Sequence, residues 1–102
     1  MDNTRQIQAA GLPWFAREDY EAFRRLLPNR AWHPTFDQWQ AAAQQTFDKL
    51  QAERGIRVFK AHVKSDAFAE WCLARGRNID TDALLQYGND FAMRKLQEMP
   101  TH

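Results

Sequence analysis

The chain has 102 residues, of which 44% are hydrophobic and 26% are charged, a composition typical of one globular domain. Its 14 basic and 13 acidic residues leave a net charge of +1 without long blocks of either sign, which argues against binding of nucleic acid through charge. No apolar run approaches the roughly 20 residues of a membrane-spanning helix, and the start MDNTRQIQAA is too polar for a signal peptide. The single cysteine, Cys72, excludes an intrachain disulfide and favours a reducing, cytoplasmic location, as in bacteria.

Residues 1–12 show no helical periodicity, and Gly11 and Pro13 interrupt the chain where this segment ends. The segment is therefore predicted to be a mobile N-terminal arm. Residues 13–99 are expected to form a single globular helical domain, because no repeat, low-complexity tract or linker divides them. Residues 100–102 form a C-terminal tail that begins with a proline.

Two amphipathic helices are predicted in the first half of this domain. The first covers residues 16–27 and is stopped by Pro28. The second begins after Thr35, which forms a capping box with Gln38. Gly55 is expected to close the second helix.

Residues 56–63, with the sequence IRVFKAHV, are rich in β-branched and aromatic side chains and alternate apolar with polar residues. This pattern predicts a single strand between the second and third helices. A strand without a partner leaves backbone N–H and C=O groups unsatisfied. The residues expected to take part in its pairing are Ile56, Val58, Phe59, Lys60, Ala61, His62 and Val63.

The simplest partner for this strand is the same segment of a second molecule, antiparallel across a two-fold axis. Centring the pair on Ala61 sets Lys60 opposite His62, whereas centring it on Lys60 sets two lysines opposite each other. The first arrangement is preferred, and it makes the protein a homodimer. Residues 4–8 and residues 30–33 of the same chain are competing partners.

Two further helices are predicted at residues 67–75 and 82–98, the second capped by Asp80 or Thr81. Gly88 lies on the apolar stripe of the last helix, which indicates that another helix backbone approaches closely there. The predicted fold class is thus mostly α, or α+β with a minimal β component, with about four helices around one core.

No catalytic residue, metal site or cofactor is predicted. Cys72 lies beside Trp71 on the face of its helix that is expected to be buried, where a thiol acts as a small hydrophobe. The histidines, His33, His62 and His102, match no metal-ligand spacing, and neither a phosphate-binding glycine loop nor a nucleophile elbow is present.

Four residues around the loops form an aromatic loop cluster: Trp14, Phe15, Trp32 and His33. Such side chains either cap the core from outside or line a groove for a peptide or a flat ligand. Capping is the preferred interpretation, and the groove is kept as the alternative.

The last two helices also invite comparison with DNA-binding helix-turn-helix units. The second of them would enter the major groove with Asp80, Thr81 and Asp82, and carboxylates there would repel phosphates. Binding of nucleic acid is therefore a minor alternative.

Three segments occur in order along the chain: WFAREDY at residues 14–20, PTFDQW at residues 34–39 and DAFAEWC at residues 66–72. Together they resemble those of a group of small bacterial proteins of uncharacterised function. The resemblance extends over about residues 13–90 and implies a similar size and order of segments, without an activity or a cofactor.

These observations favour a non-enzymatic, homodimeric protein-interaction or regulatory module. Such a module could also bind a further protein partner. The alternative is a small-ligand-binding or enzyme-like module that uses the aromatic loop cluster.

Overall fold

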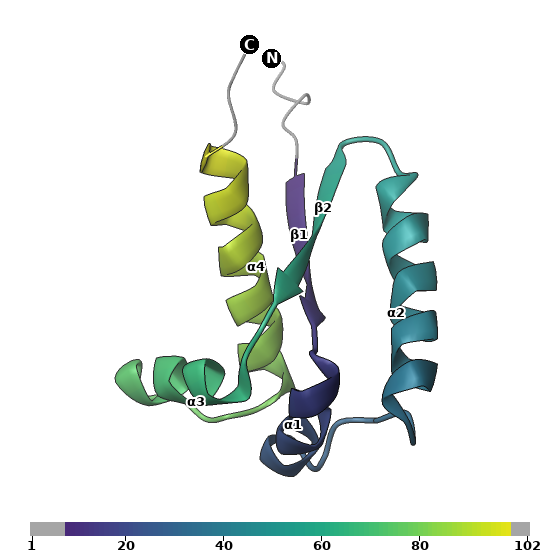
Figure 1. Ribbon diagram of the computed structural model, residues 1–102. Helices are drawn as coiled ribbons and strands as arrows, with labels where there is room; N and C mark the ends of the chain where they lie inside the picture. Colours follow the sequence, from purple (N-terminus) through teal and green to yellow (C-terminus); the bar gives the residue numbers. More distant parts are fainter. Residues whose placement is uncertain (1–7, 99–102) are drawn as a thin grey trace.

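The computed structural model describes residues 8–98, which form two strands and four α-helices (Figure 1). The mostly helical α+β class predicted from the sequence is confirmed. Residues 1–7 of the predicted arm and the tail at residues 100–102 lie outside the described residues. The elements in order are β1 (Gln8–Trp14), a 3-10 turn η2 (Arg17–Asp19), α1 (Tyr20–Leu26), α2 (Phe36–Gln51), β2 (Ile56–His62), α3 (Ser65–Ala74) and α4 (Thr81–Glu98).

The predicted strand is present as β2, but it is not a single strand, because it pairs in parallel with β1. The register sets Gln8 opposite Ile56 and Trp14 opposite His62. The expectation of a mobile arm is therefore wrong for residues 8–12, which belong to β1. The sequence of β1, QAAGLPW, contains alanine, glycine and proline, which are all depleted in strands, so its composition did not indicate one.

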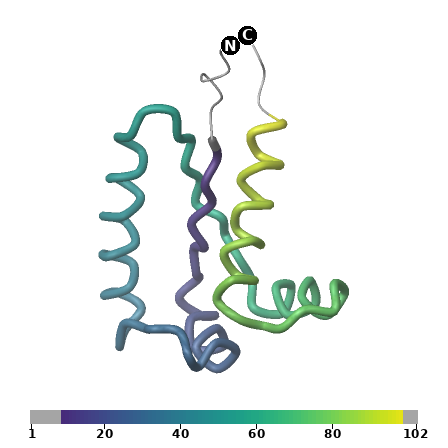
Figure 2. Tube along the Cα trace, turned by 180° about the vertical axis from the view of Figure 1, so that it is seen from behind, coloured from purple at the N-terminus to yellow at the C-terminus, as the bar shows by residue number. Residues whose placement is uncertain are grey.

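Two helices lie on opposite sides of this small sheet, α2 on one side and α4 on the other (Figures 1 and 2). Successive residues of a strand point to opposite faces. Trp14 accordingly packs on α2, with its ring centroid 5.3 Å from that of Trp39 and 6.3 Å from that of Phe47. Gly11, on the other face of β1, faces α4 at Gly88.

The contact between Gly11 and Gly88 brings two backbones together. A Cβ atom at Gly11 would lie 1.9 Å from the carbonyl oxygen of Gly88, and one at Gly88 would lie 2.8 Å from that of Gly11. The close approach predicted at Gly88 thus exists, but its partner is a strand and not another helix. Because no side chain fits between them, both positions require glycine.

Aromatic side chains dominate the core. The ring of Phe15 lies 4.7 Å from that of Phe23 and 4.9 Å from that of Trp39, measured between centroids, and all three residues are buried. Cys72 is fully buried beside this core, and burial raises the pKa of its thiol. It therefore acts as a small hydrophobic side chain.

The starts of α2 and α4 follow the sequence signals, whereas the start of α1 and the end of α2 do not. The helix expected from residue 16 begins at Tyr20, because Arg17–Asp19 form a 3-10 turn. The Thr35 hydroxyl accepts a hydrogen bond from the Gln38 N–H at 3.1 Å, which confirms the predicted cap of α2. The cap of α4 is Asp80, whose carboxylate accepts from the Ala83 N–H at 2.8 Å. Gly55, with φ of +80°, lies beyond the end of α2 and forms the turn into β2, so it does not close the helix as expected.

The start of α3 is capped from a distant part of the chain. The Asp19 carboxylate accepts hydrogen bonds from the Ser65 N–H at 2.7 Å and from the Ser65 hydroxyl at 2.6 Å. This carboxylate satisfies a donor at a helix start, where a negative charge is also stabilised by the helix dipole. It fixes α3 to the turn before α1.

Candidate functional site

At the outer edge of β1, one backbone N–H group is missing and another is bonded to α4. The Val63 N–H donates to the Trp14 carbonyl at 3.2 Å, so with the observed register the backbone groups of Trp14 point to β2 and those of Gly11 and Pro13 point away. Pro13 has no N–H to offer at this edge. The Gly11 N–H donates to the Asn89 side-chain oxygen on α4 at 3.0 Å. A further strand would therefore find no free N–H group at Gly11 or Pro13.

The outer edge of β2 is open over the described part of the chain. By the same alternation, Val58, Lys60 and His62 direct their N–H and C=O groups away from β1. No group among residues 8–98 forms a hydrogen bond with these backbone atoms. This edge, defined by Val58, Lys60 and His62, is called the open edge below.

Lysine on an exposed edge often discourages pairing, because it projects a charge across the strand. Here the Lys60 ammonium is bent back over α2, 4.4 Å from the Trp14 ring centroid and 5.0 Å from that of Phe47. It also donates to the Gln44 side-chain oxygen at 2.9 Å. The ammonium is thus held on the α2 side, and the open edge stays accessible.

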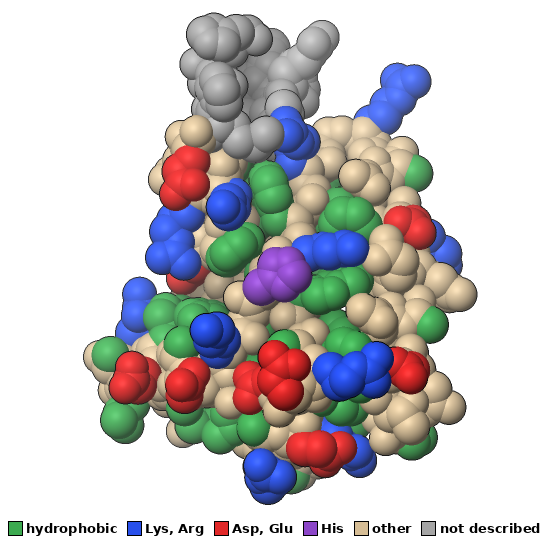
Figure 3. Space-filling model, viewed as in Figure 1, with side chains coloured by type: hydrophobic (Ala, Val, Ile, Leu, Met, Phe, Trp, Pro, Cys, Tyr) green, Lys and Arg blue, Asp and Glu red, His purple; other side chains and the backbone are tan. Residues whose placement is uncertain are grey.

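The side chains around the open edge differ in burial between the α4 side and the α2 side of the sheet. On the α4 side, Ala61 and Val63 are buried and Phe59 is half-buried. On the α2 side, His62 is exposed. Figure 1 looks onto β2, and the space-filling view from the same side shows hydrophobic side chains at the surface with basic and histidine side chains beside them (Figure 3).

The structure does not gather the aromatic loop cluster into one groove. Trp14 and Phe15 are buried in the core, while Trp32 is partly buried and donates its indole N–H to the Leu27 carbonyl at 2.8 Å. Phe15 lies 5.3 Å from Trp32 between ring centroids, whereas Trp14 faces α2. His33 is exposed. The three rings thus pack on the core, and only His33 borders an open space.

That space is a hollow of about 250 Å³ between β1, α2 and the loop after α1. His33 shares it with Arg30, a residue that the sequence did not single out because a lone arginine in a loop carries no pattern. The Arg30 guanidinium lies over the Trp32 ring, 4.5 Å from its centroid. Leu12 and Trp39 contribute apolar walls.

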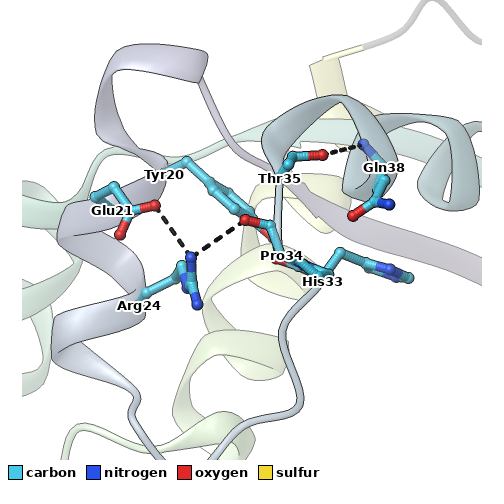
Figure 4. Close-up of polar contacts among 7 residues, drawn as sticks. All are labelled: Tyr20, Glu21, Arg24, His33, Pro34, Thr35 and Gln38. Carbon is cyan, nitrogen blue, oxygen red and sulfur yellow. Dashed lines mark hydrogen bonds and ion pairs between the residues drawn. The ribbon is translucent and has the colours of Figure 1, made fainter.

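The loop that carries His33 is fixed to α1 (Figure 4). The Tyr20 hydroxyl donates to the His33 carbonyl at 2.8 Å, and Arg24 donates to the Pro34 carbonyl at 3.4 Å. Arg24 also pairs with Glu21 at 3.1 Å. The His33 imidazole points away from these contacts, so the backbone is held while the ring stays available.

The charged residues between α3 and α4 contact other side chains or the backbone. Arg75 and Arg77 lie over the Trp71 ring, 4.5 and 5.7 Å from its centroid, and Arg77 bonds to Gln86. Asp80 is engaged in capping α4. These contacts give each residue a structural role.

No group of three or more histidine, cysteine, aspartate or glutamate side chains is placed to hold a metal ion within residues 8–98. No helix in the same part of the chain is both long and apolar enough to cross a membrane.

Comparison with protein-family models, curated proteins and solved structures found no match to this chain. The resemblance to small bacterial proteins therefore stays a prediction.

Proposed function

We propose that the protein is a non-enzymatic, homodimeric protein-interaction module of the cytoplasm, in which the β2 strands of two copies pair antiparallel. The observation that carries this proposal is the contrast between the closed edge of β1 and the open edge of β2. Exposed backbone donors and acceptors in a row are a template for a further strand. The buried thiol of Cys72 supports a reducing compartment.

The direction of the open backbone groups restricts the register. In an antiparallel ladder, residues that exchange both hydrogen bonds must both point toward the partner. The backbone N–H and C=O groups of Val58, Lys60 and His62 point outward, so each of these residues must pair with an even-numbered residue of the second copy. A two-fold axis through Ala61 meets this condition, with Lys60 bonded to His62 of the second copy, and so does an axis through Lys60.

The side chains favour the axis through Ala61. It sets one lysine against one histidine in each pair, whereas the axis through Lys60 sets two lysines directly opposite each other. It also places Phe59 of one copy beside Val63 of the other on the α4 side. About this axis, residues 59–63 of the two copies pair with each other, which at about 3.3 Å per residue gives a ladder of about 17 Å. The pairing joins the two small sheets into one of four strands.

The test compares two variants at the centre of the open edge. Lys60→Pro removes an outward N–H that has no partner within the described chain, and Lys60→Ala removes the same side chain but keeps the N–H. Sedimentation velocity over a micromolar concentration series is expected to show the wild type and Lys60→Ala at twice the mass of the 12.0 kDa chain. Lys60→Pro is expected to sediment as a monomer.

Circular dichroism checks that Lys60→Pro is folded, and the pair His62→Pro and His62→Ala repeats the test at the residue that would bond to Lys60 of the second copy. A wild-type protein that stays monomeric at every concentration contradicts the proposal. Equal dimerisation of the folded proline and alanine variants also contradicts it, because the dimer would then use another surface.

A further inference from the structure

The hollow beside β1 contains the positive charge of Arg30, which pairs with no carboxylate among residues 8–98. In the described chain, Arg17 pairs with Asp37 at 2.6 Å and Arg24 pairs with Glu21 at 3.1 Å, while no described carboxylate lies within ion-pair distance of Arg30. The Arg30 guanidinium is half-buried and stacked over aromatic rings, 4.5 Å from the Trp32 centroid and 5.4 Å from that of Phe15. Stacking fixes the plane of the guanidinium, and the N–H donors on its edge have no acceptor within the described part of the chain.

The Arg30 side chain is also held where charge is costly. Burial lowers the pKa of this guanidinium from its ordinary value, since the charged form loses hydration. An anion bound in the hollow would offset that cost. Carboxylates match the planar fork of an arginine with two parallel hydrogen bonds.

The rest of the hollow is suited to an apolar body of modest size. Leu12, Trp39 and Leu85 line it, and α2 contributes the small side chains Ala42 and Ala43. Trp39 is itself buried, so its position is fixed by the core. A hollow of about 250 Å³ is near the lower end of the range for small-molecule sites.

His33 adds a second polar group at the rim. Its backbone is anchored by the Tyr20 hydroxyl, and its ring points away from α1 (Figure 4). An imidazole can donate to a carboxylate oxygen in either tautomer. Arg30 and His33 thus give the hollow two polar side chains beside its apolar walls.

We propose that this hollow binds a small organic carboxylate with a flat or apolar body, whose carboxylate bonds to Arg30 and His33 and whose body lies against Trp39 and Leu12. The site is separate from the open edge of β2, because it lies along β1 and α2. It therefore does not depend on the dimer.

The probe is benzoate, with benzamide as its uncharged isostere and inorganic phosphate as an anion without an apolar body. Titration is followed by NMR at the indole N–H groups of Trp32 and Trp39. Benzoate is expected to cause saturable shifts at both, in the millimolar range, and benzamide and phosphate are expected to bind at least about tenfold more weakly.

Three variants locate the site. Arg30→Gln is expected to weaken benzoate binding at least about tenfold, and Arg30→Lys, which keeps the charge but not the fork, is expected to weaken it less. Arg94→Gln removes the same charge from α4 outside the hollow and is expected to leave binding unchanged. Ala42→Leu fills the hollow while keeping Arg30, and it is expected to abolish benzoate binding. This variant tests the site independently if Arg30→Gln does not fold.

The proposal is overturned if benzoate causes no saturable shift, or if benzamide or phosphate binds as tightly as benzoate. It is also overturned if Ala42→Leu, or a folded Arg30→Gln, binds benzoate like the wild type.

Discussion

The two edges of the small sheet differ although their strands pair with each other residue by residue. The outer edge of β1 is closed by three features: Pro13 lacks an N–H, the Gly11 N–H is bonded to Asn89, and α4 lies against the strand. The outer edge of β2 lacks the first two features: its outward residues Val58, Lys60 and His62 all have an N–H group, and none of these groups is bonded within residues 8–98. This difference shows that the chain protects one edge from pairing and leaves the other available.

The largest expected effect is at the backbone contact that closes β1. Gly11→Ala places a Cβ 1.9 Å from the Gly88 carbonyl oxygen, so α4 must move away from the strand, at a cost of about 3 kcal/mol or more in the free energy of unfolding. Gly88→Ala is expected to cost less, because its Cβ would lie 2.8 Å from the Gly11 oxygen and alanine gains about 1 kcal/mol in helix propensity.

Urea unfolding measures both changes. Gly55→Ala is the control, since a Cβ there meets no atom within 4 Å and only the positive φ of +80° makes alanine unfavourable, by about 1 kcal/mol. A Gly11→Ala protein as stable as Gly55→Ala would show that α4 does not close this edge.

A smaller effect is expected from the side chain that satisfies the Gly11 N–H. Asn89→Ala removes this acceptor and is expected to lower the free energy of unfolding by about 1 kcal/mol. Asn89→Asp keeps an oxygen at the same position and is the matched control, expected to retain most of the stability. Equal losses for the two variants in urea unfolding would exclude this hydrogen bond as the cause.

The smallest expected effect concerns the open edge of β2. If Lys60 meets His62 of the second copy across the open edge, His62→Glu places opposite charges face to face and strengthens the dimer, by about 0.5 kcal/mol per pair. His62→Lys weakens it by a similar amount. The dissociation constants come from sedimentation equilibrium, and two variants with the same constant would refute the axis through Ala61.

The contrast between the two edges also explains why β2 was predicted from the sequence and β1 was not. β2 was predicted because Ile56, Val58 and Phe59 have the side chains that strands prefer, and Thr35 was recognised as a cap because its signal is local. β1 was missed because Gly11 and Pro13 read as breaks in structure, although the first permits the contact with α4 and the second suits an outward edge position.

The pairing strand could be predicted from the sequence better than the hollow could, because its signal is local. Every residue expected in the pairing strand lies in β2 or directly after it, since alternation is a local property. The hollow around Arg30 depends on four segments that meet only in the fold: β1, the loop after α1, α2 and α4, which contributes Leu85. Of the aromatic loop cluster, only His33 reaches it.

Amide hydrogen exchange as a function of protein concentration tests the open edge most directly. The Gly11 N–H is bonded within the chain, so its protection is expected to be the same at all concentrations. The N–H groups of Lys60 and His62 are expected to exchange rapidly in dilute protein and to become protected as the dimer forms. Protection of Lys60 and His62 that does not change with concentration would contradict the pairing of β2 with a second copy.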